Sequence, residues 1–227
     1  KALEQDVETK VGGVVTFING KNVYIQDATG GLLLYMAAEP TFAVSQNVVV
    51  SGKTTIYYGA PELTGVTEVS AEAGVMPDPI KFESLTPLVT DSELKYFGQL
   101  VTVPGVVITE YDSYNNPTVS DGMNAAKCYK MVLDPVEFPI GTKLTVTAIA
   151  AYHNGFQFVG DVAGLQKAIA GAKDTYTYPV RHERYSLTNN WVISNVEDNY
   201  FANKPGSTGG FVRGMAAKDG IMYFINR

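Results

Sequence analysis

A repeated order of short β-type segments restricts the fold more than any other feature of the chain. In the first third, alternating and β-branched residues predict strands at residues 11–18, 22–26, 32–36, 48–58 and 63–69. Turn-forming residues separate these segments. Asn19-Gly20 favours a tight hairpin, and residues 27–31 combine an aspartate with two glycines. The pattern therefore predicts a small β-domain of five strands.

The same order of segments recurs further along the chain. Residues 11–16 align with residues 97–102, which lie 86 positions later, and residues 47–52 align with residues 143–148, which lie 96 positions later. Residues 57–59 likewise align with 153–155 as the turn before a last strand. The change in spacing predicts an insertion of about ten residues in the second copy, and the polar loop 110–117 is its expected place.

Five strands with a bent, glycine-containing first strand match the five-stranded Greek-key barrel of the OB-fold. Glycine removes the side chain where a strand must coil sharply to serve both edges of a small barrel. The glycines available for this role are Gly12, Gly13, Gly98 and Gly105. We therefore predict an all-β protein with two tandem OB-like barrels, at residues 8–75 and 93–173. A single β-sandwich of about ten strands would show the same alternation and stays open as an alternative.

Three segments lie outside the strands of these barrels. Residues 76–92 contain three prolines and predict an extended linker. Residues 163–173 predict a short helix at the end of the second barrel, because Leu165 and Ile169 are four positions apart. Residues 174–227 predict an incomplete β-rich segment, since the final alternating run, 220–227, has no following strand as a hairpin mate. We therefore expect the chain to be a piece of a longer protein.

Several kinds of chemistry are excluded by composition. Cys128 is the only cysteine, so an internal disulfide, a CxxC pair and a multi-cysteine zinc site cannot form, and a core position is expected for it. The sequence contains no HExxH, GxSxG or P-loop motif. His153 and His182 are the only histidines, and no orienting partner is evident for either. Glu197-Asp198 would point to opposite faces of a strand. We predict a protein without catalytic activity and without a cofactor.

One loop has a spacing that resembles a calcium site. Asp112, Tyr114 and Asn116 occupy every second position, as the ligands of a calcium loop do. The glycine and the distal glutamate of such a loop are missing from the sequence. No metal site is therefore predicted.

Aromatic side chains are the candidates for ligand binding. The ligand face of an OB-fold lies on its second and third strands and the loops beside them, where aromatic rings stack on bases or sugars. If Val23 and Ile25 point into the barrel, the residues between and after them point out. One residue of the pair at 57 and 58 must then point inward. The predicted ligand-binding residues are Tyr24, Gln26, Tyr35, Tyr57 and Tyr58.

Charge helps to choose the ligand. The chain carries 17 basic and 23 acidic residues, a net charge of −6. Residues 8–78 sum to −4 and residues 81–173 to −2, whereas residues 174–227 sum to +1. Binding to a phosphate backbone needs a positive groove, which the acidic barrels do not supply. A glycan or a partner protein domain is therefore the expected ligand. The alternatives are single-stranded nucleic acid bound on the OB face, and a spacer without a ligand. The sequence has no apolar run of 18 residues, which argues against a membrane-spanning helix.

Two segments resemble known modules. Residues 21–31, Lys-Asn-Val-Tyr-Ile-Gln-Asp-Ala-Thr-Gly-Gly, resemble the strand-turn-strand signature of OB-like domains in secreted proteins and surface lipoproteins of Gram-negative gut anaerobes. The second copy keeps only residues 119–122 of this signature. Residues 213–224 resemble the start of the propeller-like domain that follows such modules. The resemblance implies an exported, periplasmic or cell-surface protein, whose leader either has been removed before Lys1 or lies outside this sequence. It also implies that the barrels are accessory modules of a longer chain and precede a further domain.

Overall fold

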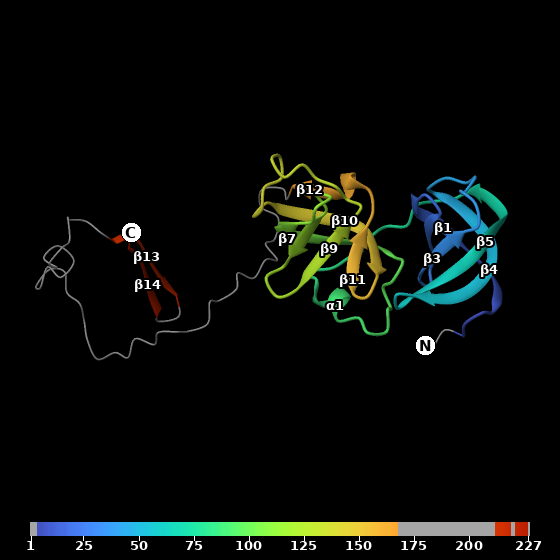
Figure 1. Cartoon of the computed structure of the whole chain (residues 1–227), viewed down its shortest axis with the longest axis horizontal. Helices are drawn as coiled ribbons and strands as arrows, with labels where there is room; N and C mark the ends of the chain where they lie inside the picture. Colours follow the sequence, from blue (N-terminus) through green and yellow to red (C-terminus); the bar gives the residue numbers. More distant parts are fainter. Residues whose placement is uncertain (1–3, 168–211, 219–220, 227) are drawn as a thin grey trace, which may run out of the picture. The chain divides into compact units, whose positions relative to one another are not determined.

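The computed structural model describes residues 4–167, 212–218 and 221–226 (Figure 1). The chain divides into two units, Lys1–Pro179 and Val180–Arg227. The described residues are all-β, with only short helical turns at α1 (Thr86–Val89) and η1 (Val162–Gly164). Within these ranges, no helix is long and apolar enough to cross a membrane.

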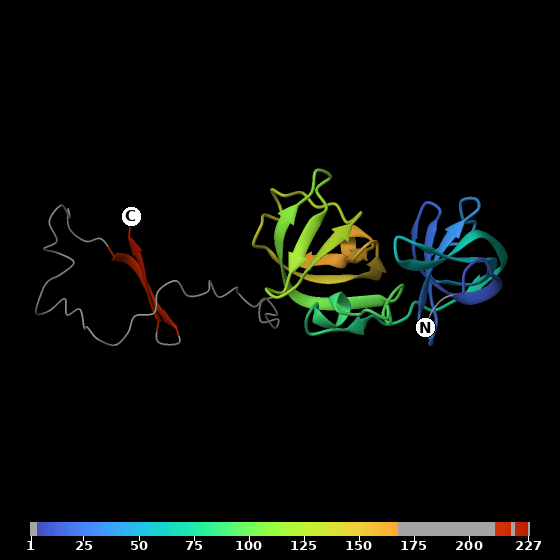
Figure 2. The same ribbon diagram turned by 60° about the horizontal axis from the view of Figure 1, so that its bottom comes forward.

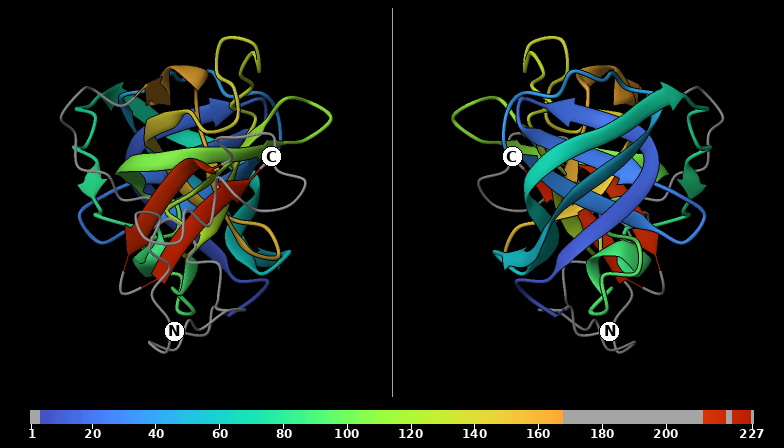
Figure 3. Two further views of the ribbon diagram at one scale, coloured as in Figure 1. Left: turned by 90° about the vertical axis from the view of Figure 1, so that its left-hand side faces the viewer. Right: turned by 90° about the vertical axis from the view of Figure 1, so that its right-hand side faces the viewer.

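The first barrel consists of strands β1 to β5. Their bounds are β1 (Glu8–Asn19), β2 (Asn22–Gln26), β3 (Gly31–Met36), β4 (Gln46–Tyr57) and β5 (Ala60–Ala73). They close in the order β1-β2-β3-β5-β4, and only β3 and β5 pair in parallel. This order is the Greek key of the OB-fold, so the predicted barrel is confirmed (Figure 3, right).

The long first strand pairs with two different strands and thereby closes this barrel. β1 pairs with β4 from Glu8 to Val14 and with β2 from Val14 to Asn19. Gly13 lies beside this change of partner, where an added Cβ would stand 3.0 Å from the carbonyl oxygen of Gln26. The predicted role of a glycine in the bent strand therefore has a physical basis, because a side chain here would press against the neighbouring backbone.

The second barrel repeats this topology. Its strands are β7 (Leu100–Tyr111), β8 (Pro117–Ser120), β9 (Ala125–Tyr129), β10 (Lys143–Tyr152) and β11 (Phe156–Val159). The pairing of β10 with β7 closes the ring β7-β8-β9-β11-β10, in which β9 and β11 are the parallel pair. Two further strands extend it: β6 (Ile80–Lys81) pairs with β7, and β12 (Leu165–Lys167) pairs with β10.

The repeat is real, but the alignment predicted for its first strand is wrong. Val11 pairs with Val50, and Val103 pairs with Val146, so the counterpart of Val11 lies 92 residues later rather than 86. Val50 and Val146 keep the predicted spacing of 96. The spacing therefore changes by only a few residues, and the second copy has no ten-residue insertion in loop 110–117. Gly98, which suggested the other alignment, precedes β7 and contacts the first barrel instead.

The predicted linker contributes to the second barrel. Residues 80–89 contain β6, α1 and the residues between them, and three side chains of this segment are buried in the core of the second barrel: Phe82, Leu85 and Leu88. Figure 2 shows the segment lying along the barrel. Pro87 stands in the first turn of α1, where its missing N–H breaks no helical hydrogen bond. Burial of apolar side chains therefore orders most of a proline-rich segment for which an extended linker was predicted.

The helix predicted for residues 163–173 is wrong where the structure describes it. Asp161 accepts a hydrogen bond from the Ala163 N–H and begins the short turn η1, and β12 follows immediately. β12 pairs with β10 from Leu144 to Val146, so the free edge of β10 satisfies its backbone. Edge pairing and burial of Leu165 therefore override the helical spacing. Residues 168–173 lie outside the described residues.

The second unit is described only at β13 (Val212–Lys218) and β14 (Ile221–Asn226), which form an antiparallel hairpin. The mate of the last strand therefore precedes it, and the prediction that its mate is missing is wrong. His182 and Glu197-Asp198 lie outside the described residues. The resemblance of residues 213–224 to a propeller-like domain stays a prediction.

Candidate ligand-binding site

The ligand face predicted on the first barrel is covered by the second barrel. Tyr24 and Gln26 face out of the barrel as predicted, but they are only 6% and 7% exposed. Tyr24 packs in an apolar cluster with Leu33 of its own barrel and with Ile149 and other residues of the second barrel. The Leu100 N–H donates a hydrogen bond of 2.8 Å to Oε1 of Gln26. This face is therefore a docking surface between the barrels.

Two glycines bring the backbones of the barrels together. A Cβ added to Gly31 would stand 2.1 Å from the carbonyl carbon of Gly98, and a Cβ added to Gly98 would stand 2.6 Å from that of Gly31. Gly98 also has a φ of +74°, which other residues rarely adopt. No side chain fits between these two positions while the barrels are docked.

Burial changes the ionisation of two groups in this interface. Burial, with a smaller contribution from the charge of Glu62, raises the pKa of Tyr24 far above its ordinary value. Glu62, which is 8% exposed, has its own pKa raised by burial. Both shifts favour the neutral forms, as expected for a docking surface from which water is excluded.

An exposed group of rings lies where the two barrels meet. Tyr57 and Tyr58 are 56% and 47% exposed, and their ring centroids are 4.5 Å apart in an edge-to-face arrangement. The ring of His153, from the second barrel, lies 4.2 Å from that of Tyr58 and 6.3 Å from that of Tyr57. We call Tyr57, Tyr58 and His153 the aromatic cluster.

Two corresponding turns position the aromatic cluster. Tyr58 stands in the turn between β4 and β5, and His153 in the turn between β10 and β11. The Asn154 N–H donates a hydrogen bond of 2.9 Å to the backbone oxygen of Tyr58. Gly59 has a φ of +80°, and a Cβ there would stand 2.8 Å from the ring of Tyr152. The turns are therefore held together by a backbone hydrogen bond and a close glycine contact.

The sequence predicted Tyr57 and Tyr58 as ligand-binding residues but not His153. The expectation that one of Tyr57 and Tyr58 points inward is wrong, because Tyr58 has a φ of +46° and the strand alternation ends before it. The sequence contains His153 as one of two histidines without an evident orienting partner, and it gives no indication of a ring beside Tyr58. The alignment of residues 57–59 with 153–155 identified the two turns as counterparts, but nothing in it indicated that they touch.

Tyr35 lies apart from the aromatic cluster. It is 45% exposed on β3 and pairs with Thr64 of β5. Tyr57 pairs with Ala60, which lies on β5 four residues before Thr64, the partner of Tyr35. Of the five predicted ligand-binding residues, the structure therefore brings Tyr57 and Tyr58 together, covers Tyr24 and Gln26, and leaves Tyr35 exposed elsewhere.

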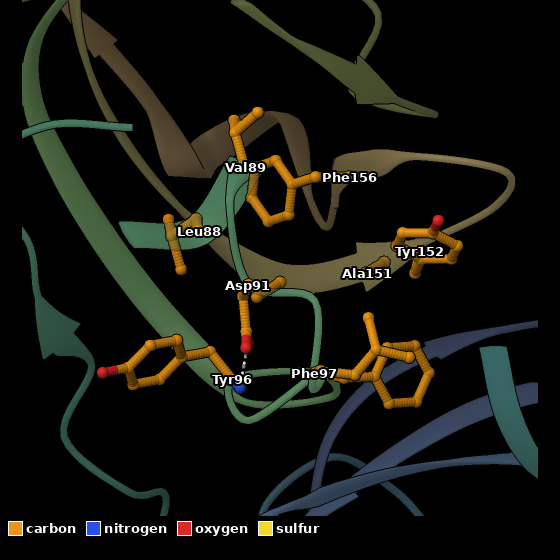
Figure 4. Close-up of a pocket in the computed structure, with 10 residues that line it drawn as sticks. Leu88, Val89, Asp91, Tyr96, Phe97, Ala151, Tyr152 and Phe156 are labelled. Carbon is orange, nitrogen blue, oxygen red and sulfur yellow. Dashed lines mark hydrogen bonds between the residues drawn. The ribbon is translucent and has the colours of Figure 1, made fainter. Parts of the chain in front are cut away.

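A small pocket beside α1 is too narrow for a sugar or a base. It has about 20 Å³ of free space and is lined by residues of α1, the loop after it and strands β10 and β11 (Figure 4). In its wall, the Tyr96 N–H donates a hydrogen bond of 2.9 Å to the Asp91 carboxylate. Space of this size accommodates about one water molecule. The aromatic cluster is therefore the better candidate for a ligand site.

The loop with calcium-like spacing holds an internal ion pair. Nζ of Lys127 lies 2.6 Å from Oδ2 of Asp112, whose Oδ1 accepts hydrogen bonds from the N–H groups of Tyr114 and Asn116. The bond from Lys127 is the main reason why the pKa of Asp112 is lowered. A lysine ammonium thus occupies the side of the carboxylate where a cation would bind. In the ranges that the structure describes, no three metal-ligating side chains gather.

Cys128 takes a core position, as predicted. Its side chain is fully buried in the second barrel, and burial raises the pKa of its thiol. A buried thiol with a raised pKa is a poor nucleophile.

Comparison with known proteins does not place the chain in a family. No protein-family model matches the sequence, and no curated protein matches it. The functional interpretation therefore depends on the barrel topology and on the geometry of the aromatic cluster.

Proposed function

We propose that the tandem barrels are a non-catalytic recognition module that binds a neutral glycan at the aromatic cluster. The observation that carries this proposal is the exposure of two tyrosine rings beside a histidine ring, on turns that are held in place by cross-barrel contacts. The polarised C–H bonds on one face of a sugar ring are attracted to the negative face of an aromatic ring. Oligosaccharide binding is also an established use of OB-folds.

Charge and burial favour a glycan over nucleic acid. Both barrels carry net negative charge, −4 over residues 8–78 and −2 over residues 81–173, which opposes a phosphate backbone. Single-stranded nucleic acid would also need a free ligand face. On the first barrel, the side chains of Tyr24 and Gln26 on that face are buried against the second barrel. A neutral sugar at the aromatic cluster meets neither obstacle.

The proposal extends to the setting of the module. The resemblance of residues 21–31 and 213–224 to modules of exported proteins supports a place at the cell surface or in the periplasm, in front of a further domain of the same chain. A glycan-binding accessory module fits such a place. A partner protein domain bound at the aromatic cluster, or a spacer without a ligand, would occupy the same setting.

Isothermal calorimetry on the full chain tests the proposed function. The probes are neutral hexasaccharides of glucose, mannose and xylose, with a single-stranded oligonucleotide of six to ten bases for comparison. Because stacking of a base on an aromatic side chain contributes about 1–3 kcal/mol, and a sugar ring stacked on Tyr58 is expected to contribute similarly, Tyr58→Ala is expected to weaken binding of the best hexasaccharide at least about fivefold. Tyr35→Ala is the matched control, since it removes an exposed tyrosine of the same barrel outside the cluster.

Three results would contradict the proposal. Oligonucleotide binding that weakens steeply with salt, without hexasaccharide binding, would favour the nucleic-acid alternative. Equal losses for Tyr58→Ala and Tyr35→Ala would place the site elsewhere. Absence of binding to every hexasaccharide would leave a protein partner or a spacer.

A further inference from the structure

We propose that the aromatic cluster is a composite site, complete only while the first barrel is docked on the second, so that ligand binding and barrel docking stabilise each other. This inference rests on the proposed glycan-binding function and concerns the regulation of the same site. It follows from where the rings originate: Tyr57 and Tyr58 belong to the first barrel, and His153 belongs to the second.

The contacts that complete the cluster all cross between the barrels. The Tyr58 and His153 rings are 4.2 Å apart, with 35° between their planes. The Asn154 N–H bonds to the Tyr58 carbonyl, and Gly59 lies against the ring of Tyr152. Undocking would remove all three contacts and leave Tyr57 and Tyr58 without the third ring.

Docking also involves residues outside the aromatic cluster, which makes it separately testable. The Gln26 to Leu100 hydrogen bond and the contact between Gly31 and Gly98 lie on β2, at the start of β3 and just before β7. Leu33 adds an apolar contact on β3. None of these residues belongs to the aromatic cluster. A substitution here can therefore change docking without removing a ring from the site.

Thermodynamic linkage then gives the direction of the effect. A hexasaccharide that touches rings of both barrels binds the docked form more tightly than the undocked form. It must stabilise docking by the same factor by which docking raises its affinity. Binding is therefore expected to slow the exchange of amide hydrogens that are protected only in the docked form.

Gly31→Val is the variant that tests this coupling. The new side chain would collide with the backbone of Gly98, while Gly31 lies outside the core of its own barrel. Gly20→Asn is the matched control, because it changes a glycine of the same barrel where an added Cβ would meet no other part of the chain within 4 Å. Its φ of +59° is one that asparagine tolerates.

Two measurements on the full chain decide the outcome. Hydrogen exchange followed by NMR is expected to show at least tenfold faster exchange of the Asn154 and Leu100 amides in Gly31→Val, and no change in Gly20→Asn. Calorimetry is expected to show at least a tenfold loss of affinity for the best hexasaccharide in Gly31→Val alone. In the unsubstituted protein, the hexasaccharide should slow exchange of the Asn154 amide.

The failure of this inference differs from the failure of the proposed function. Faster exchange with unchanged affinity would overturn the composite site but leave glycan binding intact. Absence of hexasaccharide binding in the unsubstituted protein would overturn the proposed function itself, and the composite site with it. If Gly31→Val leaves exchange unchanged, Leu33→Asp introduces a charge into the same interface, and the same two outcomes apply.

Discussion

Glu62 shows how burial beside the interface changes the chemistry of a single side chain. It lies on β5 beside Leu33 and is almost fully buried in the docked pair. Burial raises its pKa from the ordinary value of 4.5, because a charged carboxylate loses its hydration there. The protonated form therefore favours folding. Its contribution is fully present below pH 4.5 and is lost as the pH rises through the raised pKa.

Replacing this carboxylate with a neutral amide is expected to stabilise the protein at neutral pH. Glu62→Gln should raise the free energy of unfolding at pH 7 by roughly 1 kcal/mol, with the gain disappearing at pH 4 and below. Urea unfolding at both pH values measures the difference. Glu39→Gln, which makes the same change at an exposed position, should have little effect at either pH. A loss of stability in Glu62→Gln at pH 7 would contradict this account.

Alternation along a strand predicts the direction of a side chain but not what it meets. It placed Val23 and Ile25 inside the barrel and Tyr24 and Gln26 outside, and the structure agrees. Whether an outward side chain meets water or another barrel depends on tertiary docking, which alternation does not encode. At Tyr58 the rule fails for a local reason, since the residue has already left the strand conformation.

Corresponding turns in the two barrels use an aspartate in the same way. Between β2 and β3, Oδ1 of Asp27 accepts hydrogen bonds from the N–H groups of Thr29 and Gly30. Between β8 and β9, 94 residues later, Oδ1 of Asp121 accepts bonds from the N–H groups of the second and third residues after it. Asp121 does more, because its Oδ2 also accepts the Leu85 N–H from the segment before α1.

The extra bond should make the second turn the more sensitive of the two. Asp121→Ala is expected to lower the free energy of unfolding by about 2–3 kcal/mol, because it leaves the buried Leu85 N–H without an acceptor. Asp27→Ala removes bonds at an exposed turn and should cost less. Urea unfolding of both variants measures the difference. Equal losses would mean that the bond to Leu85 contributes nothing.

At the level of elements, local signals predicted the barrel strands, whereas edge pairing produced β6 and β12. The alternating segments and the turns at Asn19-Gly20 and Asp27 predicted the strands of the first barrel well. β6 and β12 could not be predicted in this way, because each forms on an edge that its partner strand, β7 or β10, leaves free. Pairing with the free edge of β10 also explains why residues 165–167 form a strand where a helix was predicted.

At the level of the whole molecule, the two copies differ where they dock. Leu33 lies in the interface, and its counterpart 94 residues later is the half-exposed Lys127. Ile149 lies in the interface from the second barrel, and its counterpart 96 residues earlier is the exposed Lys53. Each barrel therefore has one apolar outer face, on different strands, and these two faces meet. The corresponding positions on the faces that do not meet carry charged side chains instead, Lys127 on the second barrel and Lys53 on the first.

Because the two apolar faces bury each other, we expect the two barrels to unfold as one unit. Leu33→Asp is expected to uncouple them, because the charge enters the interface while the core of the first barrel, which does not include Leu33, stays intact. Differential scanning calorimetry of the full chain should then resolve separate transitions for the two barrels, where the unsubstituted protein shows a single shared one. Val44→Asp places the same charge at an exposed valine of the same barrel and should keep the shared transition. If both variants keep it, the barrels are coupled by something other than this apolar contact. If the unsubstituted protein already shows two barrel transitions, docking contributes too little to join them.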